Sequence, residues 1–340
     1  MKTLLIGGGG TLGSYAAKEL LSLGHEVDVI ALEELTSDNP SLRYIRARVD
    51  DPFLQAFLAE RRYDVVVDFI HYPDPDAYKA RCPLLLSHAG RLVFLSSYRI
   101  YADEEHPIRE TSPQLLDVFK DDAFLMENDR YGLSKSKDEK ILYQTGYDNW
   151  TVVRPLISFS HFRLDLVTQG ATTLLTRPKA GKKILLPKDA ANLTAGLTWA
   201  GNTGKMIARL AVNEEARGQA YTLGTGEENT WRDVADMYTR QCGAQFEWVD
   251  TETYLKYATL NIPHDRVILC YDRLFDRKVD CSKVQAVTGL TTSDFTPVED
   301  GLAFELGLIA DHPSERLLKT IGSDSAKEVN RRMDEYFSLS

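Results

Sequence analysis

Short apolar runs alternate with stretches of helical pattern through the first 155 residues. The runs "KTLLIG", "HEVDVIAL", "YDVVVDFI" and "RLVFLSS" are nearly continuous in apolar residues, and stretches such as "YAAKELLSLG" and "DPFLQAFLAERR" between them have the pattern of amphipathic helices. A continuous apolar run is typical of a strand that is buried on both faces, as in a parallel sheet covered by helices. The alternation therefore predicts a doubly wound α/β fold with a parallel central sheet.

This rhythm ends after "WTVVRP", residues 150–155. Beyond it, "GKKILLP" and "FEWVD" indicate short strands among helices, and "SAKEVNRRMDEYFSL" indicates a C-terminal helix. No low-complexity tract or long linker separates the two parts, so we expect them to pack together. The predicted division is a first domain of residues 1–155 and a smaller C-terminal lobe of residues 156–340.

A glycine-rich turn, "IGGGGTLG", stands between the first strand and the first helix. Gly7, Gly10 and Gly13 would permit a tight turn and let backbone N–H groups approach a pyrophosphate, whose charge the helix N-terminus favours. The order of strand, glycine turn and helix predicts a Rossmann-type domain that binds a dinucleotide, NAD or NADP. We expect Thr11 and Leu12 to line the cofactor together with the three glycines.

Composition argues against several other functions. The formal net charge is −10, whereas contacts with nucleic-acid phosphates need a basic surface. No stretch reaches the roughly 18 apolar residues of a membrane span, and the N-terminal run is too short for a signal peptide. The four cysteines stand far apart without histidines at metal-ligand spacing, so we expect reduced thiols and no metal site. The expectation is a cytoplasmic protein that binds neither nucleic acid nor membrane.

Four stretches together resemble one family. The glycines have the spacing GxxGxxG, and they are followed by "FLSSYRIY" at 94–101, "YGLSK" at 131–135 and "VVRP" at 152–155. In this order they resemble the extended short-chain dehydrogenase/reductase superfamily, to which the NAD-dependent epimerase/dehydratase family belongs. The resemblance implies an NAD(P)-dependent epimerase or reductase with a substrate-binding C-terminal lobe. It also implies a homodimer and a small-molecule substrate with a reacting hydroxyl or carbonyl, such as a sugar derivative or a nucleotide sugar.

The same resemblance implies a catalytic set. Tyr131 stands where the family has its acid/base, and Lys135 lies four residues later, on the same face of a helix. The Lys135 ammonium would stabilise the phenolate form of Tyr131 and orient the nicotinamide ribose, and the phenolate would take a proton from an alcohol. Ser97 would hold the substrate oxygen. It is preferred over Ser96 because it stands four residues before Tyr101, in the register of the family's catalytic residue.

Other positions of the cofactor site depart from the family pattern. Ala31 ends the second strand where NAD-using relatives carry an aspartate on the ribose; Glu33 is the candidate substitute, and the alternative is that Glu33 and Glu34 are both solvated surface residues. Glu33 and Glu34 would repel a 2′-phosphate, so NAD is favoured over NADP, and both stay open. Arg48 is expected to stack on adenine, to meet a phosphate or to form a surface ion pair. Ile70, after the fourth strand, is expected beside the cofactor.

Three residues are expected at the substrate. His71 is either a polar contact to the substrate or nicotinamide, or a structural histidine. Arg273 and Arg277 precede "DCSK", where relatives place an arginine on a nucleotide diphosphate; a guanidinium fork suits phosphate, and a surface ion pair is the alternative. Tyr98 and Arg99 replace the acidic pair with which related dehydratases eliminate water, which argues against dehydration by that route.

A non-catalytic role on the same fold is the alternative. The segment "VVVDFIHYPDPDAY" also resembles atypical members related to chloroplast stem-loop RNA-binding proteins, and a sensor that binds NAD(P) without turnover is a further option. RNA binding predicts a basic face and a damaged catalytic set. The acidic net charge and the intact Ser97, Tyr131 and Lys135 favour an enzyme.

Overall fold

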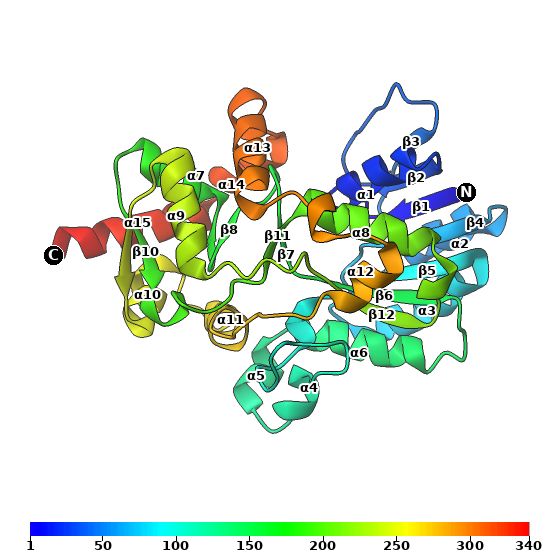
Figure 1. The fold of residues 1–340 in the computed structure, drawn as a ribbon, viewed down its shortest axis with the longest axis horizontal. Helices are drawn as coiled ribbons and strands as arrows, with labels where there is room; N and C mark the ends of the chain where they lie inside the picture. Colours follow the sequence, from blue (N-terminus) through cyan, green and yellow to red (C-terminus); the bar gives the residue numbers. More distant parts are fainter. Residues whose placement is uncertain (340) are drawn as a thin grey trace.

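A seven-stranded parallel sheet forms the centre of the molecule in the computed structural model, which describes residues 1–339 (Figure 1). Its strand order is β12-β6-β5-β4-β1-β2-β3, so the chain winds outward from β1 in one direction and then in the other. This order confirms the predicted doubly wound, Rossmann-type fold. The strands are β1 (Lys2–Ile6), β2 (Glu26–Ala31), β3 (Leu42–Arg46), β4 (Tyr63–Asp68), β5 (Ala89–Leu95), β6 (Trp150–Pro155) and β12 (Gln219–Leu223).

Helices cover both faces of this sheet, which explains why most of the side chains of its central strands are apolar and buried. On β1, Leu5 packs against one layer of helices while Leu4 and Ile6 pack against the other. The layer on the Leu5 side contains α1 (Thr11–Ser22), α8 (Ala200–Val212) and α12 (Ser282–Thr288). The opposite layer contains α2 (Asp51–Ala59), α3 (Pro75–His88) and α6 (Gly132–Tyr143).

The C-terminal lobe lies beside the carboxyl ends of the central strands and has its own apolar core (Figure 1). Its strands form three pairs: β7 (Ile157–Phe159) with β11 (Leu197–Trp199), β8 (Asp165–Leu166) with β9 (Gln169–Gly170), and β10 (Ile184–Pro187) with β13 (Phe246–Val249). Its helices are α7 (Ala171–Lys179), α9 (Trp231–Cys242), α10 (Thr251–Ala258), α11 (Pro263–Ile268), α13 (Val298–Asp311), α14 (Glu315–Ile321) and α15 (Asp324–Leu339). Two short helices, α4 (Leu115–Val118) and α5 (Ala123–Asn128), precede α6.

The chain returns to the first unit after residue 155. β12 pairs with β6 at the edge of the central sheet, and α8 packs against α1. Residues from beyond position 155 therefore complete both the sheet and one of its helical layers. The division at residue 155 stays a prediction about domains, and the two parts share the central sheet.

A buried ion pair joins β6 to α6. The Arg154 guanidinium donates to both carboxylate oxygens of Glu139, at 2.9 and 2.6 Å, and both side chains are almost fully buried. The same guanidinium donates to the hydroxyl of Tyr101 at 2.7 Å and to the backbone oxygen of Glu110 at 2.8 Å. Two charges out of water are stable only with such complete pairing, so the position of α6 on the sheet is tightly specified.

A second buried carboxylate, Glu305 on α13, connects the C-terminal lobe to α1. It accepts hydrogen bonds from the Tyr15 hydroxyl, from Trp199 Nε1 at 2.6 Å, and from the backbone and ring nitrogens of His161, both at 2.7 Å. Burial acts to raise the pKa of Glu305, but the hydrogen bonds from His161, Tyr15 and Trp199 outweigh it and hold the pKa below its ordinary value. The ionised carboxylate therefore stabilises the contact between the lobe and α1.

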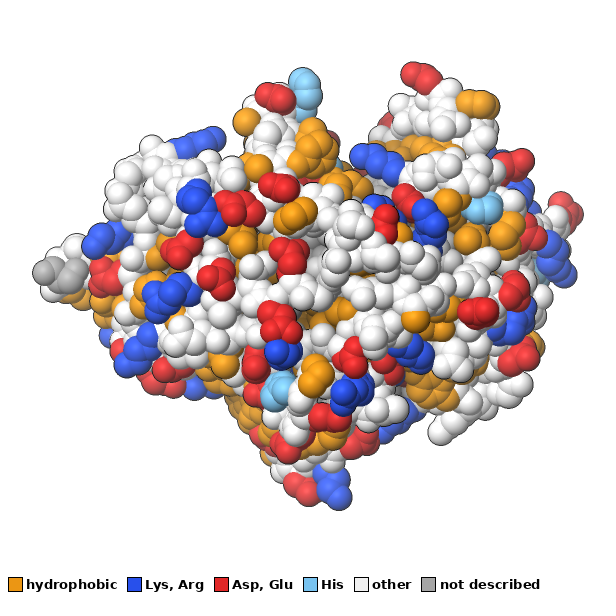
Figure 2. Space-filling model, viewed as in Figure 1, with side chains coloured by type: hydrophobic (Ala, Val, Ile, Leu, Met, Phe, Trp, Pro, Cys, Tyr) orange, Lys and Arg blue, Asp and Glu red, His pale blue; other side chains and the backbone are white. Residues whose placement is uncertain are grey.

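Charged side chains of both signs are interspersed over one face of the molecule (Figure 2). That face shows no extended area of basic side chains alone. Within residues 1–339, no helix combines the length and the apolar character that a membrane crossing needs. In the same residues, no three His, Cys, Asp or Glu side chains are grouped as metal ligands would be.

We expect Glu305→Gln to lower the free energy of unfolding at pH 7 by about 2 kcal/mol, because charged hydrogen bonds become neutral ones. A carboxylate with a depressed folded-state pKa adds stability above its unfolded pKa of 4.5 and loses that stability as the pH falls through its folded pKa. The difference in unfolding free energy between the native chain and Glu305→Gln, measured by urea denaturation, should therefore be smaller at pH 3.5 than at pH 7. Glu299→Gln on the same helix removes only an exposed pair with Arg240 and should change little. A deficit that is independent of pH would contradict the role of the ionised carboxylate.

Candidate active site

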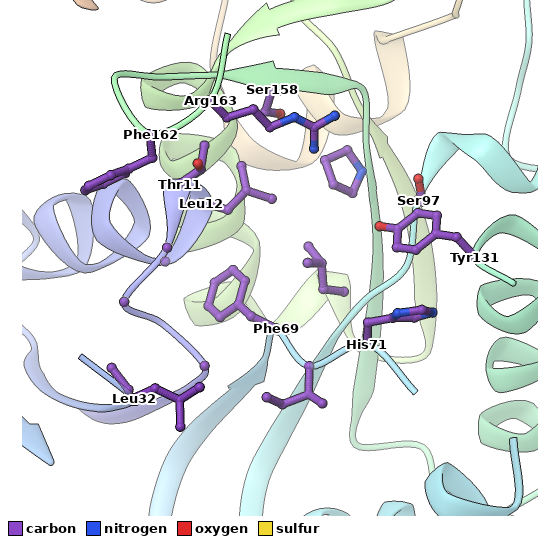
Figure 3. Close-up of a pocket in the computed structure, with 18 of the residues that line it drawn as sticks. Thr11, Leu12, Leu32, Phe69, His71, Ser97, Tyr131, Ser158, Phe162 and Arg163 are labelled. Atoms are coloured by element: carbon purple, nitrogen blue, oxygen red, sulfur yellow. The ribbon is translucent and has the colours of Figure 1, made fainter. Parts of the chain in front are cut away.

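A cleft of about 900 Å³ opens at the carboxyl ends of the central strands. It extends from the glycine turn after β1, past the ends of β4 and β5, to segments of the C-terminal lobe (Figure 3). This edge is where ligands of doubly wound folds bind. Only one acidic residue, Glu33, lines it, against six arginines: Arg48, Arg99, Arg130, Arg163, Arg273 and Arg316.

The glycine turn forms one wall of the cleft. All five residues predicted there line it: Gly7, Gly10, Thr11, Leu12 and Gly13. Gly7 has a φ of +73°, in the left-handed region that favours glycine. A Cβ added to Gly13 would lie 2.3 Å from the carbonyl oxygen of Gly8, so only glycine lets the turn pack onto α1.

Gly10 leaves the start of α1 open. It precedes the helix with extended backbone angles and supplies no side-chain cap, so amide N–H groups of the first turn lack a side-chain acceptor. A Cβ added to Gly10 would have one neighbour within 4 Å, a terminal guanidinium nitrogen of Arg316 at 3.4 Å. The helix start therefore faces the cleft and can accept an anion.

Glu33 and Arg48 lie at the end of the cleft beside Ala31. The Glu33 carboxylate stands against the glycine turn, because a Cβ added to Gly9 would lie 3.0 Å from Glu33 Oε2. Glu34 is absent from the cleft and pairs with Arg46 at 2.9 Å on the exposed surface. Of the two glutamates predicted to disfavour a 2′-phosphate, only Glu33 faces this site.

Tyr131 and Ser97 lie beside each other at the opposite end of the cleft (Figure 3). The Tyr131 ring contacts the imidazole of His71, with ring centroids 4.9 Å apart, and the guanidinium of Arg99 lies 5.3 Å from the Tyr131 ring centroid. Ser97 accepts a hydrogen bond from the Arg99 backbone N–H at 3.2 Å. Ser96 is fully buried and does not line the cleft, so Ser97 is the serine that the structure places at the site.

Asp129 fixes the start of the helix that follows Tyr131. One carboxylate oxygen accepts from the backbone N–H groups of Tyr131 and Gly132 at 2.9 and 3.1 Å, and the other accepts from Leu133 at 3.2 Å. The carboxylate also pairs with Arg99 at 3.5 Å. A buried cap of this kind sets where α6 begins and hence where Tyr131 stands.

Lys135 lies beneath the cleft and does not line it. Its ammonium donates a hydrogen bond to the backbone oxygen of Ile70 at 3.0 Å, and Ile70 does line the cleft. Burial lowers the pKa of Lys135, while the charges of Asp68 and Asp138 act to raise it. This bond uses one of the three N–H donors of the ammonium, and the role of Lys135 as a cofactor ligand stays a prediction.

His71 lines the cleft with its ring and is held by its Nε2 atom. Nε2 lies 3.1 Å from the backbone oxygen of Arg130 and 3.0 Å from the hydroxyl of Ser134. Burial lowers the pKa of His71 below its ordinary value, and the charge of Lys135 lowers it further. His71 thus contacts Tyr131 and α6 while its ring also lines the cleft, so both predicted roles, structural and substrate contact, stay open.

Asp272 is fully buried and forms ion pairs with three arginines. It accepts from Arg277 at 3.1 Å, pairs with Arg99 at 3.4 Å and also accepts from Arg273. Burial acts to raise the pKa of Asp272, but the three guanidinium groups outweigh it and hold the pKa low. Arg273 lines the cleft, whereas Arg277 does not and donates instead to the backbone oxygen of Tyr101 at 3.0 Å.

Two arginines at the reactive end were not predicted from the sequence. Arg163, between β7 and β8, extends across the cleft toward Ser97 and pairs with Asp165 at 2.7 Å (Figure 3). Arg130 directly precedes Tyr131, and within residues 1–339 its guanidinium has no hydrogen bond or ion pair. The segment "SFSHFRLDL" around Arg163 carries no family motif, and Asp129 stands two residues before Tyr131, the N-cap of α6, so its role follows from the structure and not from the usual capping pattern.

Comparisons with known proteins agree with this geometry. Residues 3–193 match the model of the NAD dependent epimerase/dehydratase family. A search of curated protein sequences finds no match. Among solved structures, Pal from Bacillus thuringiensis aligns with a TM-score of 0.68 and 16% identity, covering 92% of this chain and 99% of that one.

Two further solved structures contain ligands. WbmG from Bordetella bronchiseptica, in complex with NAD and UDP, aligns with a TM-score of 0.67 and 18% identity over 93% of this chain and 96% of that one. UDP-glucuronic acid 4-epimerase from Bacillus cereus, in complex with UDP-glucuronic acid and NAD, aligns with a TM-score of 0.65 and 14% identity over 92% and 99%. At these identities the likeness establishes the fold.

We expect Asp129→Ala to lower the free energy of unfolding by about 1–2 kcal/mol, because α6 loses its N-terminal cap. Asp129→Asn keeps one side-chain oxygen that can accept from the backbone, so its free energy of unfolding should lie between those of the native chain and the alanine variant. Denaturant unfolding of the three proteins measures both effects. Equal stability of the alanine variant and the native chain would show that the cap does not hold α6.

Proposed function

Because the chain belongs to the NAD-dependent epimerase/dehydratase family, we propose that it interconverts a hydroxyl and a carbonyl of a nucleotide sugar, with NAD as cofactor and Tyr131 as acid/base. The observation that carries this proposal is the placement of Tyr131 beside Ser97 at one end of a cleft whose other wall is the glycine turn (Figure 3). A proton carrier and an oxygen anchor are thereby in reach of one substrate group.

The residues of the cleft fit a dinucleotide. Gly10 leaves the start of α1 accessible to a diphosphate, and Glu33 offers a carboxylate to ribose hydroxyls at the adjoining end. A bound nicotinamide would supply the acceptance and return of a hydride. Thr11, Leu12 and Ile70 would hold the cofactor by contact along the wall between the two ends.

The protein's own groups would then handle the proton. Ser97 would donate a hydrogen bond to the substrate oxygen and hold it beside the Tyr131 hydroxyl, which would take or return the proton. His71 and Arg99 would support this step by packing against the tyrosine ring. Lys135 supports it from below, through Ile70 or by direct contact with the ribose.

The charge of the cleft supports an anionic substrate. Arg163 and Arg273 come from the C-terminal lobe, and although each has an acidic partner, Arg130 next to Tyr131 has none within residues 1–339. A cleft so rich in guanidinium groups, in a chain with a net charge of −10, suits a nucleotide diphosphate. The aligned structures that contain UDP or UDP-glucuronic acid favour the same class.

The residues next to Ser97 argue against dehydration by the route of the related dehydratases. Tyr98 donates its hydroxyl to Asp272 at 2.7 Å, and Arg99 pairs with Asp129 and Asp272, so neither supplies the carboxyl group of a dehydratase. In epimerisation the product has the oxidation state of the substrate, whereas in net reduction it does not. Product analysis distinguishes the two reactions. A homodimer and a cytoplasmic location stay predictions.

We expect Tyr131→Phe to reduce turnover on the order of 100-fold or more while the fold and NAD binding survive, because only the proton carrier is lost. Formation of reduced nicotinamide and of product, with UDP-glucose and UDP-glucuronic acid as probes, measures the rate. Tyr147→Phe, an exposed tyrosine just beyond α6, serves as the matched control. Turnover at the native rate by Tyr131→Phe would overturn the acid/base assignment, and the absence of chemistry in every variant would favour a non-catalytic role.

We further expect the native chain to bind NAD at least about tenfold more tightly than NADP, because Glu33 would repel a 2′-phosphate. Glu33→Gln should bring the ratio of the NADP dissociation constant to the NAD dissociation constant closer to one. Glu34→Gln should leave the ratio unchanged, since Glu34 is paired with Arg46 outside the cleft. Calorimetric titration gives both constants, and tighter binding of NADP by the native chain would refute the preference.

A further inference from the structure

Arg316 stands at the glycine turn although it belongs to the far end of the chain. It lies on α14, in the C-terminal lobe, and lines the cleft together with Gly10 and Thr11. Its terminal nitrogen would be 3.4 Å from a Cβ at Gly10. The family match ends at residue 193, so no motif of that match covers this arginine.

α14 is anchored so that Arg316 faces the turn. Ser314 caps the helix by accepting from the Leu317 backbone N–H at 3.2 Å, and the Leu317 side chain is fully buried against the lobe. The lobe also reaches the start of α1 through Ser160, whose hydroxyl donates to Thr11 Oγ1 at 3.2 Å. Packing on the lobe therefore holds α14 near α1, and the exposed Arg316 side chain extends from it to the glycine turn.

The Arg316 side chain has no internal partner. Within residues 1–339 its guanidinium makes no hydrogen bond and no ion pair, whereas Lys319 on the same helix pairs with Glu315 at 2.7 Å. The one acidic residue that lines the cleft, Glu33, stands against Gly9 and makes no ion pair with Arg316. A free guanidinium beside open helix amides offers the two kinds of donor that suit phosphate oxygens.

We propose that Arg316 binds the diphosphate of the dinucleotide, so that α14 clamps the cofactor from the C-terminal lobe. This inference rests on the proposed function, since it assigns a residue to the same cofactor site. The amides of α1 would hold one side of the diphosphate and the guanidinium fork the other. Binding of the cofactor would then also order α14, because the helix gains a charged partner.

The test compares ligands with and without the diphosphate. Dissociation constants for NAD, ADP-ribose and adenosine are measured by calorimetry on the native chain, Arg316→Gln, Arg316→Lys and Lys319→Gln. Arg316→Gln should raise the dissociation constants of NAD and ADP-ribose about tenfold or more and leave that of adenosine unchanged. Arg316→Lys should lose less affinity for NAD and ADP-ribose, because lysine keeps the positive charge but lacks the planar guanidinium. Lys319→Gln should bind all three ligands with the affinity of the native chain.

Hydrogen exchange gives a second readout. Amides of residues 314–321 should exchange more slowly when NAD binds the native chain, and this protection should be lost in Arg316→Gln. Native-like affinity of Arg316→Gln for NAD, or equal weakening by Arg316→Gln and Lys319→Gln, would overturn the inference and leave the proposed function intact. A native chain that binds neither NAD nor ADP-ribose would overturn the proposed function and the inference with it.

Discussion

The buried pair of Arg154 and Glu139 joins β6 to α6 at the centre of the first unit. Each charge would cost several kcal/mol if it were buried alone, so β6 and α6 have one relative position in which both are satisfied. Tyr101 joins the same cluster and also shares a hydrogen bond of 2.7 Å with Thr222 on β12. One cluster therefore aligns the segment after Ser97, the helix after Tyr131 and the edge strand of the sheet.

The architecture of the first unit was predictable because its physical signals are local. Strands buried on both faces are rich in apolar residues, and β1, β2, β4 and β5 each contain a run of three or more of them. The glycine turn was recognisable for a similar reason, since Gly7 needs a positive φ and Gly13 has no room for a side chain. Ser97 follows the end of β5, and Tyr131 precedes the start of α6. Both of these ends lie at the same edge of the sheet, so both residues line the cleft.

Several features depend on contacts that no short pattern records. Lys135 shares its helix with Tyr131, but whether its ammonium contacts the cleft or Ile70 depends on the loop after β4. Arg277 is withdrawn from the cleft by Asp272, five positions away in the chain and fully buried. β12 is a short strand whose partner β6 lies far back in the sequence, so its place in the central sheet follows from tertiary packing alone. Arg316 reaches the glycine turn for the same reason.

The bond between Tyr15 and Glu305 joins residues 290 positions apart. At a synthesis rate of about 5–20 residues per second, the ribosome would need about 15–60 seconds to deliver the acceptor after the donor has been made. During that interval the buried hydroxyl of α1 lacks its partner, and β6 is an open edge until β12 arrives. The nascent chain would thus spend most of its synthesis with an incomplete first unit.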